Sequence, residues 1–189
     1  MEVPNNKTAI ESNRQAWNDS ARHHQDSPDW QALLGEVAQA DFSCLDETLS
    51  GLLEVDGKEV IQLGCNNGRE SLSLFALGAR SVVGVDQSAA FLEQARELNK
   101  RSPHNAEFIE TDIHHLPASL HNRFDVALIT IGVLNWMPDI GEFSDVPVIE
   151  PLCLELPYRL ISLVDAGDDS DLIKRIRAIR KKFVGEVGF

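Results

Sequence analysis

Short apolar runs alternate with segments of helical periodicity through the middle of this chain. The four runs cover residues 60–64, 82–86, 106–109 and 124–131, and the last is almost continuously apolar. Such runs are typical of strands that are buried on both faces of a parallel sheet. Strands that alternate with helices imply parallel pairing through right-handed crossovers. The pattern therefore predicts an α/β fold with a doubly wound, mostly parallel sheet.

The residues before the first strand have the periodicity of helices. Thr8 and Glu11 form a capping-box pattern, and Ser27 followed by Pro28 is a second helix-start signal. A third apolar face runs over residues 45–53. No glycine-rich linker separates these helices from the strand at residue 60. We expect residues 1–56 to pack on the sheet region as part of one domain.

The last part of the chain breaks the alternation of strands and helices. Prolines at 147, 151 and 157 interrupt any long helix after the fourth strand. Acidic residues then precede a basic stretch, an order that suits the helix dipole. The apolar positions of that segment are expected on one face of an amphipathic surface helix: Leu172, Ile176, Ile179 and Phe183.

Charge and composition narrow the classes of partner. Lys and Arg number 17 against 30 Asp and Glu, which gives a net charge of −13. A chain this acidic repels a phosphate backbone, so no nucleic-acid partner is expected. Three widely spaced cysteines favour a reducing compartment over a disulfide framework. Neither a signal peptide nor a membrane-spanning run is visible in the sequence, so we expect a cytoplasmic protein without a membrane partner.

A glycine turn follows the first strand, and an acid ends the second. Gly64 and Gly68 let the backbone approach a ligand closely, and Asn66 tolerates left-handed backbone angles. Asp86 lies at the carboxyl end of its strand, the edge at which open α/β sheets bind ligands. A carboxylate there can accept both hydroxyls of a ribose. The pattern indicates a nucleoside site.

These motifs resemble the class I S-adenosylmethionine-dependent methyltransferases, in particular the small-molecule type. The resemblance runs from about Asn13 to Phe143 and rests on the 62–68 turn, Asp86, Asp112-Ile113 and the strand at 124–129. It implies a Rossmann-like core over residues 57–143, S-adenosylmethionine as cofactor and a small-molecule methyl acceptor. It also implies that residues 1–56 form a lid, because Asn13 to Asn18 are similar to the family's lid helix.

The resemblance also assigns roles to individual residues. The glycine-rich turn would wrap the methionine part, Asp86 would hold the ribose, and Asp112 would accept from the adenine amine. Trp17 of the lid would lie near the sulfonium, where a ring face attracts a cation. The implied cofactor-binding residues are Trp17, Gln62, Gly64, Asn66, Gly68, Asp86, Gln87, Asp112, Ile113, Thr130 and Ile131.

Three features depart from the family pattern. Gln62 replaces the acid that usually opens the first motif, and Asn66 replaces its middle glycine. Residues 144–189 do not resemble the family, which usually continues with a Pro-Gly-Gly turn and further strands. We expect the C-terminal part of the sheet to be incomplete or atypical, through an unusual ending, a truncation or a frameshift. An incomplete sheet leaves an edge strand through which the chain could form a homodimer.

The sequence does not select a catalytic residue. A general base is needed only if the methyl acceptor must lose a proton. The candidates follow the adenine-side acid, end the lid helix or follow the fourth strand: His114, His115, His23, His24, Asn135 and Trp136. No metal site is expected, because His114 and His115 are adjacent and would point in different directions on regular structure.

Two alternative functions remain open at this point. A degenerate protein would bind the cofactor without turning it over. A nicotinamide-dependent dehydrogenase also uses a glycine turn and an acid after the second strand. However, the turn lacks the Gly-x-Gly-x-x-Gly order that seats a pyrophosphate.

Overall fold

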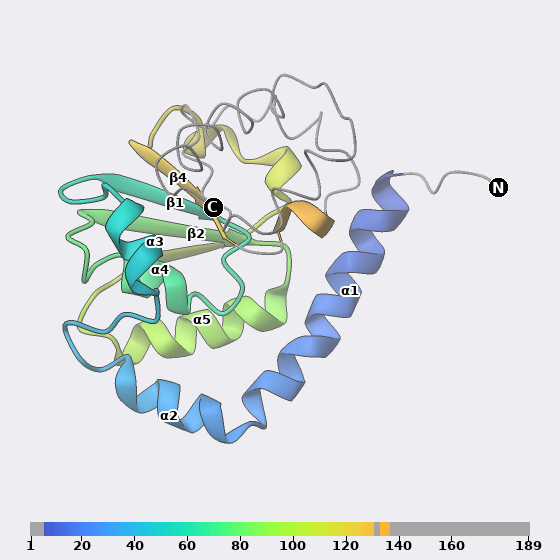
Figure 1. The fold of residues 1–189 in the computed structure, drawn as a ribbon. Helices are drawn as coiled ribbons and strands as arrows, with labels where there is room; N and C mark the ends of the chain where they lie inside the picture. The colour runs from blue at the N-terminus through green and yellow to red at the C-terminus, as the bar shows by residue number, and fades with distance from the viewer. Residues whose placement is uncertain (1–5, 131–132, 137–189) are drawn as a thin grey trace, which may run out of the picture.

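The computed structural model describes residues 6–130 and 133–136, which form a parallel sheet with helices packed against it (Figure 1). Within these residues, four strands lie in the order β3-β2-β1-β4. All three pairings are parallel, and β1 lies between β2 and β4. The strands are β1 (Glu59–Leu63), β2 (Ser81–Asp86), β3 (Glu107–Glu110) and β4 (Val126–Ile129). The predicted α/β fold with a mostly parallel sheet is confirmed.

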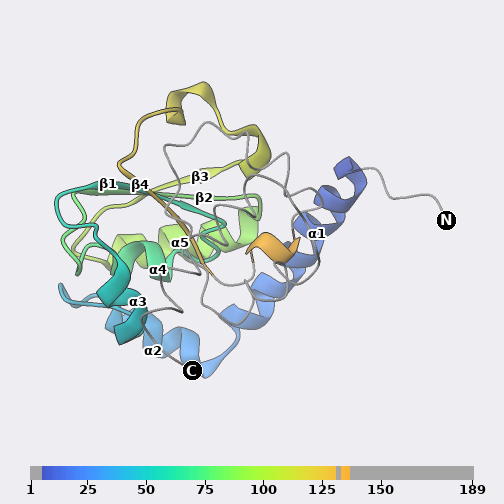
Figure 2. The same cartoon turned by 45° about the horizontal axis from the view of Figure 1, so that its top comes forward.

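The helices α4 (Arg69–Ser73) and α5 (Ala89–Arg101) connect consecutive strands and lie on one face of the sheet (Figure 2). Ser88 caps α5, and its hydroxyl oxygen accepts a hydrogen bond of 3.2 Å from the N–H of Phe91. The helix α4 ends at Ser73, and the chain continues in tight turns up to Gly78, whose φ is +88°.

Between residue 6 and the first strand, the structure has three helices: α1 (Asn6–Gln25), α2 (Pro28–Glu36) and α3 (Glu47–Leu52). Ser27 caps α2 as predicted, with its hydroxyl oxygen accepting from the N–H of Trp30 at 3.3 Å. The capping-box prediction at Thr8 is wrong, because Thr8 lies inside α1.

One hydrophobic core joins the N-terminal helices to the sheet. Trp30 and Leu34 of α2 belong to the same buried cluster as Val60 of β1, Val82 of β2 and Leu128 of β4. Every residue of β4 is buried, as its apolar run predicts. The expected single domain for the described part is consistent with this shared core, and the division at residue 56 stays a prediction. The predictions for residues 144–189 lie outside the described residues.

Candidate functional site

A cavity of about 340 Å³ lies at the carboxyl ends of the strands. The residue after β1, the last residue of β2, the loop after β3 and the residue after β4 all line it: Gly64, Asp86, Asp112 and Thr130. The helix α1 closes another side with Ile10, Asn13, Trp17 and His24. The sheet order reverses at β1, and open α/β sheets bind ligands at such a switch point. The cavity is within the size range of small-molecule sites.

The turn after β1 has the backbone that its sequence predicts. Gly64, Asn66 and Gly68 have φ angles of +71°, +52° and +74°. A side chain at Gly64 would place its Cβ 2.6 Å from Val133, and one at Gly68 would place it 2.5 Å from Phe108. Both glycines are therefore required by conformation and by space. Asn66 takes the left-handed angle that its side chain tolerates.

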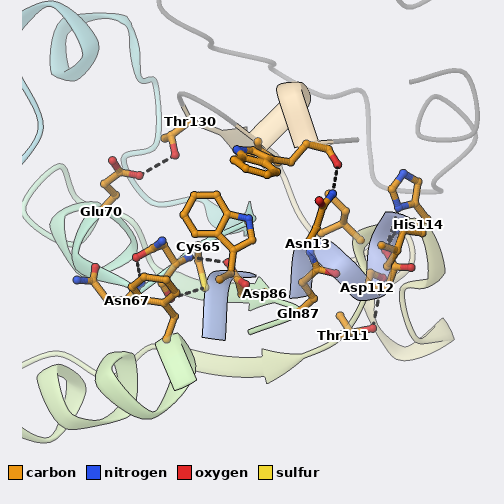
Figure 3. Close-up of a pocket in the computed structure, with 18 of the residues that line it drawn as sticks. Asn13, Cys65, Asn67, Glu70, Asp86, Gln87, Thr111, Asp112, His114 and Thr130 are labelled. Carbon is orange, nitrogen blue, oxygen red and sulfur yellow. Dashed lines mark hydrogen bonds and ion pairs between the residues drawn. The ribbon is translucent and has the colours of Figure 1, made fainter. Parts of the chain in front are cut away.

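Asp86 ends β2 beside this turn. Its Oδ2 accepts a hydrogen bond of 2.8 Å from the N–H of Asn66, and its Oδ1 accepts one of 2.9 Å from the N–H of Ser88. Burial raises the pKa of the Asp86 carboxyl, and these backbone donors oppose that rise. The carboxylate is thus held in a fixed orientation at the centre of the cavity (Figure 3).

The Asp112 carboxylate contacts the rings of two histidines that the sequence analysis expected to point in different directions. His114 Nδ1 lies 2.9 Å from Oδ1, and His115 Nδ1 lies 3.1 Å from Oδ2. The expectation that the two rings point in different directions is wrong, because the short 3-10 helix η1 (Ile113–His115) turns both toward the same carboxylate. Burial raises the pKa of Asp112, but the hydrogen bonds from His114 and His115 outweigh it and lower the pKa to about 2.

A second carboxylate lies at the other end of the cavity. Glu70 Oε2 accepts a hydrogen bond of 2.7 Å from the Thr130 hydroxyl and one of 2.8 Å from Gln62 Nε2. Gln62 is fully buried, and its Oε1 accepts from the hydroxyl of Ser71. The sequence analysis did not single out Glu70. The signal was available, because the acid expected at position 62 is missing and another acid follows Gly68 by two residues.

The helix α1 contacts the segment after β4 through aromatic rings. Trp17 packs on Trp136 with ring centroids 5.1 Å apart in an edge-on arrangement, and on Phe91 at 6.2 Å. Asn13 Nδ2 donates a hydrogen bond of 2.7 Å to the carbonyl of Trp136 (Figure 3). These contacts place η3 (Val133–Trp136) and α1 over the same cavity.

Ser88 links α1 to Asp86. Its N–H donates to Asp86, while its hydroxyl donates a hydrogen bond of 2.8 Å to Asn18 Oδ1 of α1. The same Asn18 oxygen accepts from the N–H of Ala90 at 3.2 Å. One turn further along α1, the carbonyl of Ala21 accepts from Gln94 Nε2 at 2.6 Å. The C-terminal half of α1 is thereby fixed to α5.

Residues 60–144 match a protein family described as "Methyltransferase domain". This part of the chain is a class I S-adenosylmethionine-dependent methyltransferase domain. The family match, together with the parallel sheet and its switch-point cavity, confirms the resemblance drawn from the motifs. The cofactor of this methyltransferase domain is S-adenosylmethionine, which removes the dehydrogenase alternative.

Individual relatives cover only parts of the chain. A tRNA U34 carboxymethyltransferase of Nautilia profundicola is 29% identical over 87 residues, which are 46% of this chain and 28% of that protein. A candidate protein N5-glutamine methyltransferase of Methanocaldococcus jannaschii is 31% identical over 80 residues, 42% of this chain and 39% of that protein. A solved structure of Haemonchus contortus phosphoethanolamine N-methyltransferase 1, with phosphoethanolamine and S-adenosylhomocysteine, is 23% identical with a TM-score of 0.49 and covers 71% of this chain and 29% of that one.

A different kind of protein also matches. The flagellar biosynthesis protein FlhA of Yersinia enterocolitica is 49% identical to this chain over 47 residues, which are 25% of this chain and 7% of FlhA. The chain thus spans less than two-fifths of the length of each of these three curated relatives.

Most of the residues that the resemblance assigned to the cofactor line the cavity of the methyltransferase domain. These are Trp17, Gly64, Asn66, Asp86, Gln87, Asp112, Ile113 and Thr130. Gln62 and Gly68 are buried beside the turn and are not among the lining residues. Ile131 and the side chain of Asn135 lie outside what the structure describes. Residues lining the cavity that the assignment missed include Asn67, Glu70, Thr111 and Val133.

The candidate catalytic residues divide in the same way. His24, His114 and Trp136 line the cavity, whereas His23 and His115 are not among its lining residues. Among residues 6–130 and 133–136, no group of three or more His, Cys, Asp or Glu side chains is placed to hold a metal ion. In the same residues, no helix combines the length and the apolar character that crossing a bilayer requires.

Proposed function

We propose that this methyltransferase transfers the methyl group of S-adenosylmethionine to a small molecule. The observation that carries the proposal is the position of Asp86, a fixed carboxylate at the end of β2 in a cavity lined by all four strand ends. The net charge of −13 supports a small acceptor over a nucleic acid.

The residues present fit the cofactor. Asp86 would accept from the ribose hydroxyls, because its two backbone donors occupy only two of about four acceptor sites of a carboxylate. Asp112 accepts from His114 N–H and from both imidazoles, which leaves about one site for the exocyclic amine of adenine. Trp17 would present its ring near the sulfonium.

Methyl transfer requires mainly that the acceptor atom, the methyl group and the sulfur are aligned. When bound, S-adenosylmethionine supplies an activated methyl group on a positively charged sulfur. The cavity residues would orient the donor, and α1 with Trp17 and Trp136 would exclude water from it. Proximity and orientation then provide most of the acceleration. If the acceptor must lose a proton, His114 is a base candidate that lines the cavity and is oriented by Asp112.

Calorimetric titration of the full chain tests the cofactor site. We expect micromolar binding of S-adenosylmethionine and S-adenosylhomocysteine, no binding of NAD, and loss of binding in Asp86→Ala. Absence of binding in a cooperatively folded wild-type sample would contradict the proposal.

The acceptor class needs a separate experiment, because one relative is named for tRNA and another for protein. Radiolabelled S-adenosylmethionine can be incubated with the enzyme and with small-molecule, protein and RNA fractions of a cell extract. We expect label in the small-molecule fraction. Label in the RNA or protein fraction would overturn that part of the proposal.

The second candidate is a binding protein without turnover. It is supported by the family match, which covers residues 60–144 and leaves residues 145–189 outside it. Binding in calorimetry with no label transferred to any fraction would favour this candidate. Dimerisation through the edge of the sheet also stays a prediction, which sedimentation at working concentration can check.

The 47-residue match to FlhA bears on the origin of the C-terminal part of the chain. We propose that it falls in the last part of the chain, from about residue 143 to residue 189, so that the chain joins a methyltransferase part to a segment of different origin. The family match ends at residue 144, and the remaining length is close to 47 residues. The methyltransferase function would then reside in the residues before this segment.

The join can be checked at the level of DNA and protein. Sequencing single DNA molecules across codon 144 should give one uninterrupted reading frame, and the tryptic peptide 124–159 should occur in the proteome of the source cells. A frame that continues into further methyltransferase sequence would show that residues 144–189 do not belong to this enzyme.

A further inference from the structure

The polar residues of the cavity are arranged along its length, and this order carries an inference that rests on the proposed function. Glu70 and Thr130 lie on one side, Asp112 and His114 on the other, and Asp86 between them (Figure 3). A cofactor with its adenine at Asp112 and its ribose at Asp86 therefore extends its methionine part toward Glu70. That part carries a positively charged α-ammonium group.

The strand β1 offers no charge to this ammonium. Gln62, which takes the place of the family's acid, is neutral and fully buried. Both ends of its amide are occupied, because Oε1 accepts from Ser71 and Nε2 donates to Glu70 and, at 3.3 Å, to Thr130. The amide acts within the protein rather than toward the cavity.

The carboxylate of Glu70 lines the cavity and is held from the protein side. Its two hydrogen bonds, from Gln62 and Thr130, both end on Oε2. A carboxylate has about four acceptor sites on its two oxygens, so this one can take a further donor from a ligand. The two donors on Oε2 fix the orientation of Oε1, and both donors are neutral, so the carboxylate keeps its negative charge.

We propose that Glu70 binds the α-ammonium of the cofactor and so replaces the acid that is missing at position 62. Gln62 and Thr130 are positioning residues for this contact. In this chain the negative charge lies in the first turn of α4, whereas in the family pattern it lies on the strand. The buried amide of Gln62 holds Glu70 in place through its hydrogen bond.

A pair of ligands separates this contact from the rest of the site. S-adenosylhomocysteine carries the amino-acid group, whereas 5′-methylthioadenosine keeps the nucleoside and the sulfur but lacks the ammonium. Calorimetry of Glu70→Gln in the full chain should show affinity for S-adenosylhomocysteine reduced roughly ten- to a hundredfold, since a hydrogen bond to a charged group is lost. Affinity for 5′-methylthioadenosine should stay within about twofold of wild type.

Glu93→Gln is the matched control, because it removes one negative charge from an exposed position of α5. It should bind both ligands as wild type does. Thermal unfolding checks that each variant is folded. If Glu70→Gln does not fold, Glu70→Asp keeps the charge with a shorter reach and should weaken S-adenosylhomocysteine selectively by a smaller factor.

The possible results separate the two proposals. Equal weakening of both ligands in Glu70→Gln, or weakening of neither, would overturn the role of Glu70 and leave the methyltransferase site standing. A folded wild-type chain that binds neither ligand would overturn the proposed function and this inference with it.

Discussion

The N–H of Asn66 donates a hydrogen bond of 2.8 Å to the Asp86 carboxylate, which ties the turn after β1 to the end of β2. The other oxygen of the same carboxylate accepts from the N–H of Ser88, at the start of α5. Asp86 therefore has a structural role in two loops in addition to the ribose contact proposed for it. We expect the geometry of the cavity at these two loops to depend on this side chain.

Replacing Asp86 by asparagine keeps the size of the side chain but turns one acceptor into a donor. One of the two backbone N–H groups would then face an NH₂ group. We expect the free energy of unfolding to fall by about 1–2 kcal/mol, because a buried hydrogen bond is lost. Urea unfolding measures this change, and calorimetry should show weaker S-adenosylhomocysteine binding. Unchanged stability would mean that the loops do not depend on the carboxylate.

The glycines of the turn should not tolerate a side chain. Gly68→Ala would combine a φ of +74° with a Cβ only 2.5 Å from the Phe108 ring. The left-handed angle alone costs roughly 1–2 kcal/mol, and overpacking adds about 1–3 kcal/mol. Gly35→Ala in α2 is the matched control, since its Cβ would meet nothing within 4 Å. Denaturant unfolding should show a lower free energy of unfolding for Gly68→Ala and little change for Gly35→Ala. Equal decreases in the two variants would contradict the steric argument.

The low pKa of Asp112 predicts how stability changes with acid. The folded pKa of about 2 lies below the ordinary value of 3.8, so Asp112 stabilises the fold above about pH 4. This contribution is lost as the pH falls through 2. The free energy of unfolding of Asp112→Asn should therefore decline less than that of wild type between pH 4 and 2. Parallel declines would show that the histidine contacts do not stabilise the ionised form.

The contact between Trp17 and Trp136 should stabilise the packing of the N-terminal half of α1. Trp136→Ala removes the ring that lies 5.1 Å from Trp17, a pair worth about 0.5–1.5 kcal/mol beyond its area. We expect faster amide hydrogen exchange in α1 before Asn18, and little change near Ala21, which Gln94 holds. A uniform increase along the whole of α1 would contradict this division of the helix.

The sequence predicted those parts of the fold that depend on local or periodic signals. The four strands, the cap at Ser27 and the position of Asp86 beside the cavity follow from such signals, whereas Asp112 was expected there only from the family resemblance. The prediction that Thr8 caps a helix was wrong, because Thr8 lies inside α1 and the same residue pattern can occur within a helix.

The parts that the sequence did not predict depend on contacts between distant segments. Glu70 meets Thr130 across sixty residues, and Asn13 meets the carbonyl of Trp136 across more than a hundred. The convergence of His114 and His115 on Asp112 depends on a 3-10 turn that periodicity does not reveal. Residue types at these positions were visible in the sequence, but their partners were not.

The position of Ser88 connects α1 to Asp86, the acid that we propose binds the ribose. A single residue donates its N–H to Asp86 and its hydroxyl to Asn18 of α1. If a bound nucleoside stabilises the packing of α1 on α5, that packing strengthens nucleoside binding by the same free energy, because coupling between two sites is reciprocal. A change at Asn18, which does not line the cavity, would thus be read out as a change in cofactor affinity.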